Sequence, residues 1–203
     1  KDFEGKTYAG WGAPSEEAVI KAVMNEAGAD FNKLTIVGSD GSGIAGLSDE
    51  VGKNKVNLGW EFYGWAIIKA MQDGYDVNYM PLADLDSRLD YYTPVIITNN
   101  KMIKKNSDTV KKFMEATKKG YEYAIDHPNK AAEILHEDAL KDTDMKFLKE
   151  SQKYLSSQYA KDADSWGVMK DSVWNNYTDF MYETGLINKK IDAKDQYTNE
   201  FVK

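Results

Sequence analysis

The hydrophobic pattern of the chain changes near residue 100, and this change constrains the fold more than any other feature. Before it, helical patterns alternate with short runs rich in β-branched and aromatic residues, namely residues 6–11, 34–37, 55–65, 77–82 and 91–98. After it, residues 101–203 keep apolar side chains at helical spacing almost throughout. The sequence therefore predicts an α/β lobe with a mixed sheet and flanking helices, followed by an all-helical segment.

Charge and cysteine content exclude several classes of protein. The chain carries 33 acidic and 26 basic residues, a net charge of −7, and so has little positive field for phosphate groups. Nucleic acid is therefore not an expected partner. The absence of cysteine excludes disulfides and thiolate metal sites, and it is compatible with a place outside a reducing cytosol. The chain opens at Lys1 without a signal segment, so we expect a processed or truncated N-terminus.

The stretch from Gly41 to Gly46 spells the dinucleotide-binding pattern G-x-G-x-x-G directly after a β-branched run. A dinucleotide site also needs a helix long enough to cross back over the sheet, and an acidic residue at the tip of the next strand. The nine residues "LSDEVGKNK" separate Gly46 from the next strand, and the candidate acid, Glu61, lies inside an aromatic run. We therefore expect an irregular, mobile loop that binds no dinucleotide.

Two strand ends carry residues suited to ligand contact, because the carboxyl ends of strands face the ligand crevice in open α/β sheets. The first strand is followed by Trp11 and Gly12, and Asp40 lies at the end of the second. Ser15 can cap the helix that follows the first strand, whose free amides favour an acceptor group of a ligand. Alternatively, Glu16 and Glu17 fill that role themselves by offsetting the helix dipole.

An aromatic cluster follows the third predicted strand. The sequence "LGWEFYGWA" places Trp60, Phe62, Tyr63 and Trp65 within six positions. Strand alternation sends Trp60 and Phe62 to one face and Glu61 to the other. Flat aromatic walls suit a planar heterocyclic ligand, whereas any one ring taken alone is better explained by core packing. We expect at least two of Trp60, Tyr63 and Trp65 to line an open concave surface, and Glu61 to meet a partner or a ligand.

Six longer motifs are spread over essentially the whole chain: "KDFEGKTYAGWGAPSEEAVIKAVMNEAGADF", "WEFYGWA", "LDYYTPVIITNNKMIKKN", "GYEYAI", "SWGVMKDSVWNNY" and "TNEFV". Together they resemble the solute-binding proteins of ABC importers for thiamine pyrimidine precursors, within the thiamine-pyrimidine-synthase-like superfamily. The resemblance implies a type II periplasmic-binding-protein fold, in which two α/β lobes hold a ligand between them. It places residues 1–93 in the second lobe, and residues 94–203 in the return strand of the hinge and in helices that pack on the first lobe, whose opening segment would precede Lys1.

The residues and the resemblance together imply a substrate-binding component that delivers a small aromatic heterocycle, such as a thiamine pyrimidine precursor, to a membrane permease. Such a protein is extracytoplasmic, either periplasmic or lipid-anchored at the outer face of the cell membrane, and it needs no cofactor or metal. The family usually has bulky residues where this chain has "GSDGSGIAG", and an apolar residue at the position of Glu61. The predicted ligand-binding residues are Trp11, Gly12, Ser15, Glu16, Asp40, Trp60, Glu61, Tyr63 and Trp65.

Three alternatives stay open at this point. The superfamily also contains pyrimidine synthases, which use a cysteine-rich segment and a consumed histidine with iron and pyridoxal phosphate; this chain has no cysteine, and His127 and His136 have neighbours typical of helix ends or solvated faces. An enzyme is therefore not expected. Related binding proteins serve riboflavin-like or sulfonate ligands. A structural or interaction module without any small-molecule site is the remaining alternative.

The helical half carries apolar faces that need a cover. They centre on Phe113, Ile134, Leu148 and Trp174. We expect these helices either to fold back onto the α/β lobe or to pair with a second copy of the chain. Pairing to a homodimer is favoured, because the predicted strand at residues 91–98 would otherwise be an unpaired edge.

Overall fold

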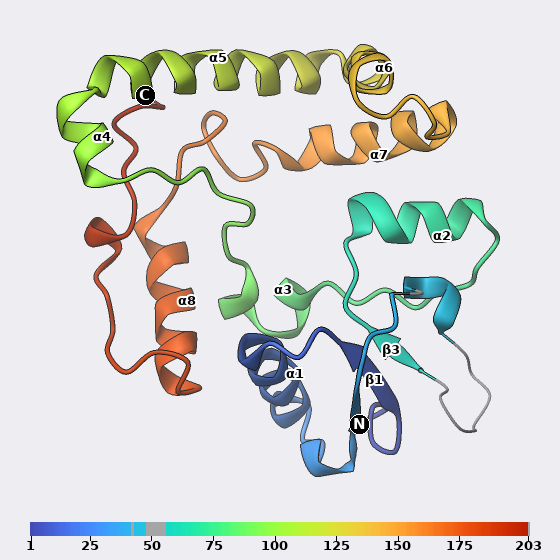
Figure 1. Cartoon of the computed structure of the whole chain (residues 1–203). Helices are drawn as coiled ribbons and strands as arrows, with labels where there is room; N and C mark the ends of the chain where they lie inside the picture. Colours follow the sequence, from blue (N-terminus) through green and yellow to red (C-terminus); the bar gives the residue numbers. More distant parts are fainter. Residues whose placement is uncertain (42, 48–55, 203) are drawn as a thin grey trace. The chain divides into compact units, whose positions relative to one another are not determined.

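The computed structural model describes residues 1–41, 43–47 and 56–202 (Figure 1). The chain forms two compact units. Unit 1 consists of Lys1–Tyr91 and Asn175–Ile191, and unit 2 of Tyr92–Trp174 and Asp192–Lys203. The division of the chain into residues 1–93 and 94–203 remains a prediction, although the first crossing between the units lies close to that boundary.

Unit 1 is built on a three-stranded parallel sheet. The strands are β1 (Thr7–Gly10), β2 (Thr35–Gly38) and β3 (Leu58–Gly59), in the order β2-β1-β3. The ladder between the first two runs from Thr7 opposite Thr35 to Gly10 opposite Gly38. Because both ladders are parallel, the carboxyl ends of all three strands meet at one edge of the sheet.

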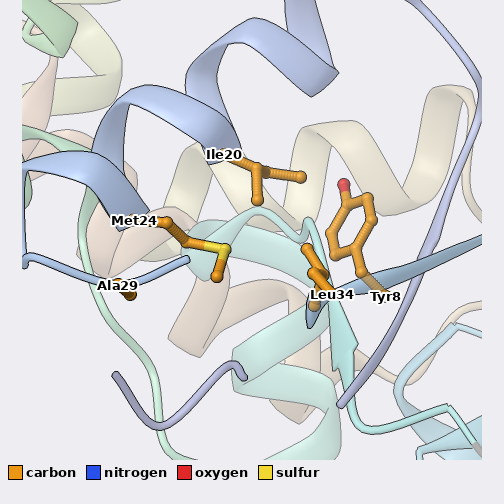
Figure 2. Close-up of a cluster of buried hydrophobic side chains, with 5 residues drawn as sticks. All are labelled: Tyr8, Ile20, Met24, Ala29 and Leu34. Atoms are coloured by element: carbon orange, nitrogen blue, oxygen red, sulfur yellow. The ribbon is translucent and has the colours of Figure 1, made fainter. Parts of the chain in front are cut away.

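Helix α1 (Pro14–Glu26) connects β1 to β2 and supplies buried residues to two hydrophobic clusters of unit 1. Its residues Ile20 and Met24 pack on Tyr8, Ala29 and Leu34, and Figure 2 shows these five side chains gathered between helix and sheet. Their spacing of four positions places Ile20 and Met24 on one face of the helix. The helical periodicity of this stretch is therefore explained by burial against the sheet.

Short helical turns complete the N-terminal part of unit 1. They are the 3-10 turns Phe31–Lys33, Gly43–Gly46 and Ser87–Leu89, the π-helix Tyr63–Ile67, and the helices α2 (Ile68–Gln72) and α3 (Leu82–Leu85). The π-helix runs directly into α2 without a break. The chain therefore leaves β3 through a widened helical turn, which is a feature often found at functional sites.

The last helix, α8 (Asp171–Glu183), closes the core of unit 1. Its Phe180 has no exposed surface and packs on Val19 and Val23 of α1 and on Leu89. The Arg88 guanidinium lies 5.5 Å from the centre of the Phe180 ring and donates to Glu183 Oε2 at 2.7 Å. Residues 175–191 therefore fold with the α/β unit, which is the first of the two arrangements expected for the helical half.

Unit 2 contains α4 (Asn100–Lys105), α5 (Ser107–Asp126), α6 (Pro128–Asp138) and α7 (Met145–Gln158). Phe147 and Leu148 of α7 and Ala132 of α6 are buried. Ser156 of α7 donates from its hydroxyl to the carbonyl of Ala124 in α5 at 2.7 Å. Leu148 is thus covered as expected, whereas Phe113 and Ile134 are 58% and 49% exposed.

The C-terminal segment is part of unit 2. It carries the 3-10 turn Ala193–Asp195. The side-chain amide of Asn199 donates to the carbonyl of Met169 at 2.8 Å and accepts from its N–H at 3.0 Å. Beyond it, Val202 is 5% exposed and lies against Gly167.

Two strand predictions are wrong. Residues 77–82 run into α3, and residues 91–98 form no ladder with any other described residue. Both stretches have high β-propensity, but a strand forms only where a neighbouring strand accepts its backbone hydrogen bonds. Among the described residues, β2 and β3 each pair with the central β1, and neither stretch pairs with them. Within the described ranges, no helix has the length and apolar character needed to cross a membrane.

Phe180→Ala is expected to destabilise unit 1 strongly. The substitution leaves a cavity among Val19, Val23 and Leu89, which costs about 3–5 kcal/mol in the free energy of unfolding. The matched control is Phe113→Ala, which removes a ring that is 58% exposed and should change stability by about 0.5 kcal/mol or less. Urea unfolding followed by circular dichroism measures both. Equal losses for the two variants would contradict the packing described for α8.

Candidate ligand-binding cleft

A cleft lies in unit 1 at the carboxyl ends of the three strands. Each strand end or the loop after it contributes to the lining. The lining residues are Ala9, Gly10, Trp11, Ser39, Asp40, Gly43, Leu47, Val56, Gly59, Trp60 and Glu61. Its position agrees with the rule that open α/β sheets bind ligands at this edge.

Two tryptophans form the aromatic wall of the cleft. Trp11 follows β1, Trp60 follows β3, and their ring centres lie 5.3 Å apart at an interplanar angle of 62°. Trp11 is 60% exposed, whereas Trp60 also packs against the two hydrophobic clusters around α1. One indole is therefore fixed by the core, and the other is presented to solvent next to it.

A buried carboxylate holds the loop after β1. Glu16 is 3% exposed and Tyr8 is 4% exposed. The Tyr8 hydroxyl donates a short hydrogen bond to Glu16 Oε1, and the N–H of Gly12 donates to Oε2 at 3.1 Å. Burial, and then the hydrogen bond to Glu16, raise the pKa of Tyr8, so the phenol remains a donor. Both oxygens of Glu16 are thus used by the fold, and the residue positions Gly12 and its neighbour Trp11.

Gly10 is required by the same arrangement. A Cβ at this position would lie 2.3 Å from Glu16 Oε1 and 2.7 Å from the Tyr8 ring. No side chain fits there without moving two buried groups. At Gly10 the cleft is therefore lined by backbone atoms, and the carboxylate of Glu16 occupies the space where a side chain of residue 10 would lie.

Ser15 does not cap helix α1, contrary to the sequence expectation. The helix begins at Pro14, and the capping position is Ala13, which makes no side-chain hydrogen bond. Proline is favoured at the first helical position because its missing N–H has no intrahelical partner there. Ser15 is consequently the second residue of the helix and does not line the cleft.

Glu61 lies on the side of the cleft that faces the glycine loop. Its Oε1 is 3.5 Å from the point where a Cβ of Gly43 would lie. Partial burial raises the pKa of its carboxyl above the ordinary value. Asp40, which also lines the cleft, already makes an interaction within the chain.

The aromatic residues beyond Glu61 do not line the cleft. Tyr63 lies in the π-helix and packs on Tyr79 with ring centres 5.0 Å apart, and Trp65 is 47% exposed. Phe62, expected on the same face as Trp60, is 66% exposed. That expectation is wrong because β3 ends at Gly59, so strand alternation does not extend to these positions.

The structure thus brings Trp11, Asp40, Trp60 and Glu61 together in one cleft. Gly12 holds the loop through Glu16, as described above. Residue-by-residue reasoning missed Ser39, Leu47 and Val56; the last two form an isolated parallel bridge beside the cleft. Ser39 directly follows β2, so the strand-end rule applied to every predicted strand would have found it.

The glycine-rich stretch forms no crossover helix among its described residues. Gly43–Gly46 is a single 3-10 turn, and Gly41 and Gly43 have φ values of 82° and 57°. The expectation of a mobile or irregular loop falls partly on Ser42, which lies outside the described residues. In the described ranges, no group of three or more His, Asp or Glu side chains is arranged to hold a metal ion.

The cleft has an enclosed volume of about 60 Å³. Complete small-molecule sites have volumes of roughly 300–1,000 Å³. The cleft is therefore the size of one wall of a binding site rather than of a whole site.

The chain belongs to the NMT1/THI5-like family, whose model matches residues 1–131. It is 25% identical over 138 residues to the formylaminopyrimidine-binding protein of Halalkalibacterium halodurans, which covers 66% of this chain and 39% of that protein. It is also 26% identical over 152 residues to the riboflavin-binding protein RibY of Chloroflexus aurantiacus, covering 68% of this chain and 41% of that protein. The chain thus spans about two fifths of the length of these relatives, and the matched family segment contains the whole cleft.

Gly10→Ala is expected to destabilise the protein by about 1–3 kcal/mol, because its Cβ must displace Glu16 or Tyr8. Gly38→Ala is the matched control: Gly38 is the register partner of Gly10 across the ladder, and a Cβ there meets nothing within 4 Å. Thermal unfolding and tryptophan fluorescence measure the effect on stability and on Trp11. A loss in Gly38→Ala as large as that in Gly10→Ala would contradict this account of the loop.

Glu61→Gln is expected to raise the free energy of unfolding at pH 7, by less than about 1 kcal/mol since the side chain is still partly solvated. The raised pKa means that the folded state disfavours the charged carboxylate, and this cost is present above the folded pKa. The cost disappears below the unfolded pKa, where the carboxyl is neutral in both states. The gain from Glu61→Gln should therefore shrink as the pH falls through the raised folded pKa, and it should be absent below the unfolded value of 4.5. A variant less stable than the wild type at pH 7 would contradict this prediction.

Proposed function

We propose that this chain is the ligand-holding part of an extracytoplasmic substrate-binding protein that serves an ABC importer and binds a small aromatic heterocycle. The observation that carries the proposal is the tryptophan-walled cleft at the ends of three parallel strands. The family adds support, because relatives of this chain are named for binding formylaminopyrimidine and riboflavin, which are both planar heterocycles. Flat indole faces suit such rings.

The same observations favour a binding protein over an enzyme. Both relatives are named as binding proteins. The Trp11 and Trp60 rings can stack on a ligand, and Asp40 and Glu61 can accept its hydrogen bonds. The two histidines belong to unit 2: His127 is the residue before α6, and His136 lies within this helix.

We propose a type II periplasmic-binding-protein arrangement for the whole protein. Residues 1–93 would form the second lobe, and residues 94–203 the returning hinge segment, which is not a strand, and helices that pack on the first lobe. The small volume of the cleft supports this arrangement, since one wall needs a second to enclose a ring. Closure on the ligand would then create the surface that a membrane permease recognises.

The remaining predicted contacts would come from residues at the rim. Tyr63 and Trp65 lie on the π-helix next to the cleft in sequence, and Trp65 is exposed. Gly12, Ser15 and Glu16 would act through the loop that carries Trp11. Pairing of two copies of the chain stays a prediction as well; Phe113 and Ile97, 58% and 85% exposed, are side chains that it would cover.

Two ligands are candidates. A thiamine pyrimidine precursor is the first, in line with the pyrimidine-binding relative. A riboflavin-like ligand is the second, because the other relative is named for it. Both offer a planar ring for Trp60, and they differ in the hydrogen-bonding groups along the ring edge.

Calorimetric titration of the full-length protein with 4-amino-2-methylpyrimidine and with riboflavin tests the proposal. We expect one of the two to bind and to raise the midpoint of thermal unfolding, since a ligand specific for the folded state stabilises it. Trp60→Leu should weaken that binding at least about tenfold, equivalent to about 1.4 kcal/mol, through loss of the stacked ring.

Phe62→Leu is the matched control, because Phe62 is two positions away, is 66% exposed and does not line the cleft. Its affinity should stay within about twofold of the wild type. The proposal fails if neither heterocycle binds the wild-type protein, or if Phe62→Leu weakens binding as much as Trp60→Leu.

A further inference from the structure

The net charge of the chain is divided unequally between the two units. In the sequence, unit 1 has 17 acidic and 10 basic residues, whereas unit 2 has 16 of each. Unit 1 therefore carries the whole net charge of −7, and unit 2 is neutral overall. A negatively charged surface repels unit 1 as a whole, but a basic patch of unit 2 can approach it.

Such a patch lies along α7. Helices α6 and α7 are neighbours in unit 2 (Figure 1), and an open hollow of about 430 Å³ lies on them. The three lysines that line it are three and four positions apart in the sequence, so they project from one face of α7 over about 10 Å. Three of the four charged groups around the hollow are thus positive. The lining residues are Asn129 of α6 and Met145, Lys146, Lys149, Glu150 and Lys153 of α7.

The charges of these lysines are not equally available. Lys149 donates to Glu133 Oε1 at 2.8 Å, and Lys130 donates to Oε2 of the same carboxylate at 2.8 Å. The hydrogen bonds from Lys130 and Lys149 lower the pKa of Glu133 to about 2, so this carboxylate stays ionised and ties α6 to α7. Lys146 and Lys153 are exposed, and in the part of the chain that the structure describes they have no ion-pair partner. These two charges are therefore free to meet a partner outside the chain.

We propose that the hollow on α7 is a contact site for the anionic phospholipid headgroups of a membrane, with Lys146 and Lys153 as its principal charges. Its volume of about 430 Å³ lies within the range of roughly 300–1,000 Å³ found for small-molecule sites, so a phosphate-bearing headgroup can enter it. The methylene stems of the lysines and the Met145 side chain offer an apolar contact to the glycerol part of such a headgroup. The inference goes beyond the proposed function, because it concerns unit 2 and holds whichever ligand the cleft takes.

The composition of the hollow favours a membrane over other anionic partners. A site for one small anion has fixed donors on several sides, whereas the lysines here come from one face of one helix. The centre of a protein–protein interface is usually depleted in lysine and glutamate and rich in aromatic side chains, which the hollow lacks among its described lining residues. Compact charges on flexible stems instead suit attraction to a surface that carries many phosphates.

Co-sedimentation of the full-length protein with lipid vesicles tests the proposal. Vesicles of equal parts phosphatidylglycerol and phosphatidylcholine should bind the protein at least tenfold more tightly than vesicles of phosphatidylcholine alone, and added salt should weaken this binding. The double variant Lys146→Gln/Lys153→Gln should lose at least about tenfold in affinity for the anionic vesicles. The matched control is Lys101→Gln/Lys112→Gln, which removes the same charge from exposed lysines of α4 and α5 outside the hollow. Its affinity should stay within about twofold of the wild type.

Four outcomes would overturn the membrane assignment. The first is equal binding of the wild type to anionic and neutral vesicles, and the second is an equal loss in the two double variants, which would indicate a general charge effect. The third is displacement of the protein from the vesicles by millimolar sn-glycerol 3-phosphate, since the hollow would then take a soluble phosphate ester. The fourth is binding of a polyglutamate peptide without binding of vesicles, which would assign the hollow to an acidic protein segment.

Two further measurements separate this site from the fold and from the cleft. Thermal unfolding of Lys146→Gln/Lys153→Gln should match that of the wild type, and Lys146→Arg/Lys153→Arg, which keeps both charges, should keep vesicle binding. Binding of the heterocycle should be unchanged in all of these variants, because none of the substituted lysines lines the cleft of unit 1. A failure of the heterocycle titrations would therefore leave the vesicle result standing, and the reverse holds as well.

Discussion

The carboxylate of Glu16 is the group on which the cleft depends. A buried polar group is tolerated only with hydrogen-bond partners around it, and here the donors are the Tyr8 hydroxyl of β1 and the backbone N–H of Gly12. The strand, the loop and the first turn of α1 must therefore be ordered together. Trp11 lies between Gly10, which leaves space for this side chain, and Gly12, whose N–H it accepts from, so the place of Trp11 beside Trp60 depends on Glu16.

Two glutamates at this edge of the sheet differ in role. The hydrogen-bond partners of each decide whether it orders the fold or remains available to other groups. Glu16 has a full set of donors within the fold, and it contributes order. Glu61 is partly buried without such donors among the residues that the structure describes, and burial raises its pKa. A buried polar group without a hydrogen-bond partner lowers the stability of the empty protein. Such groups are commonly found at binding sites rather than in cores, because there the loss of stability is balanced by a gain in function. The residue type alone therefore does not identify a ligand contact, whereas its hydrogen-bond partners do.

The sequence predicted those parts of the fold that depend on local spacing. The apolar positions of α1 and the strand at Thr7–Gly10 follow from periodicities that a few residues carry by themselves. Residues 91–98 have equal β-propensity but find no partner among the described residues, and partners are not encoded locally. In the same way, the strand-end rule located Trp11, Asp40 and Trp60. The position of Glu61 on the cleft side and the outward turn of Phe62 depend on where β3 ends, which alternation does not reveal.

The route of the chain between the two units has a consequence for how the protein is made. Unit 1 needs residues 175–191 to cover Val19 and Leu89, and unit 2 needs Asn199 and Val202 to complete the surroundings of Met169 and Gly167. Unit 1 is therefore completed by residues that leave the ribosome only after residues 92–174 of unit 2 have been made. During synthesis, neither unit can finish folding before the other has begun to emerge.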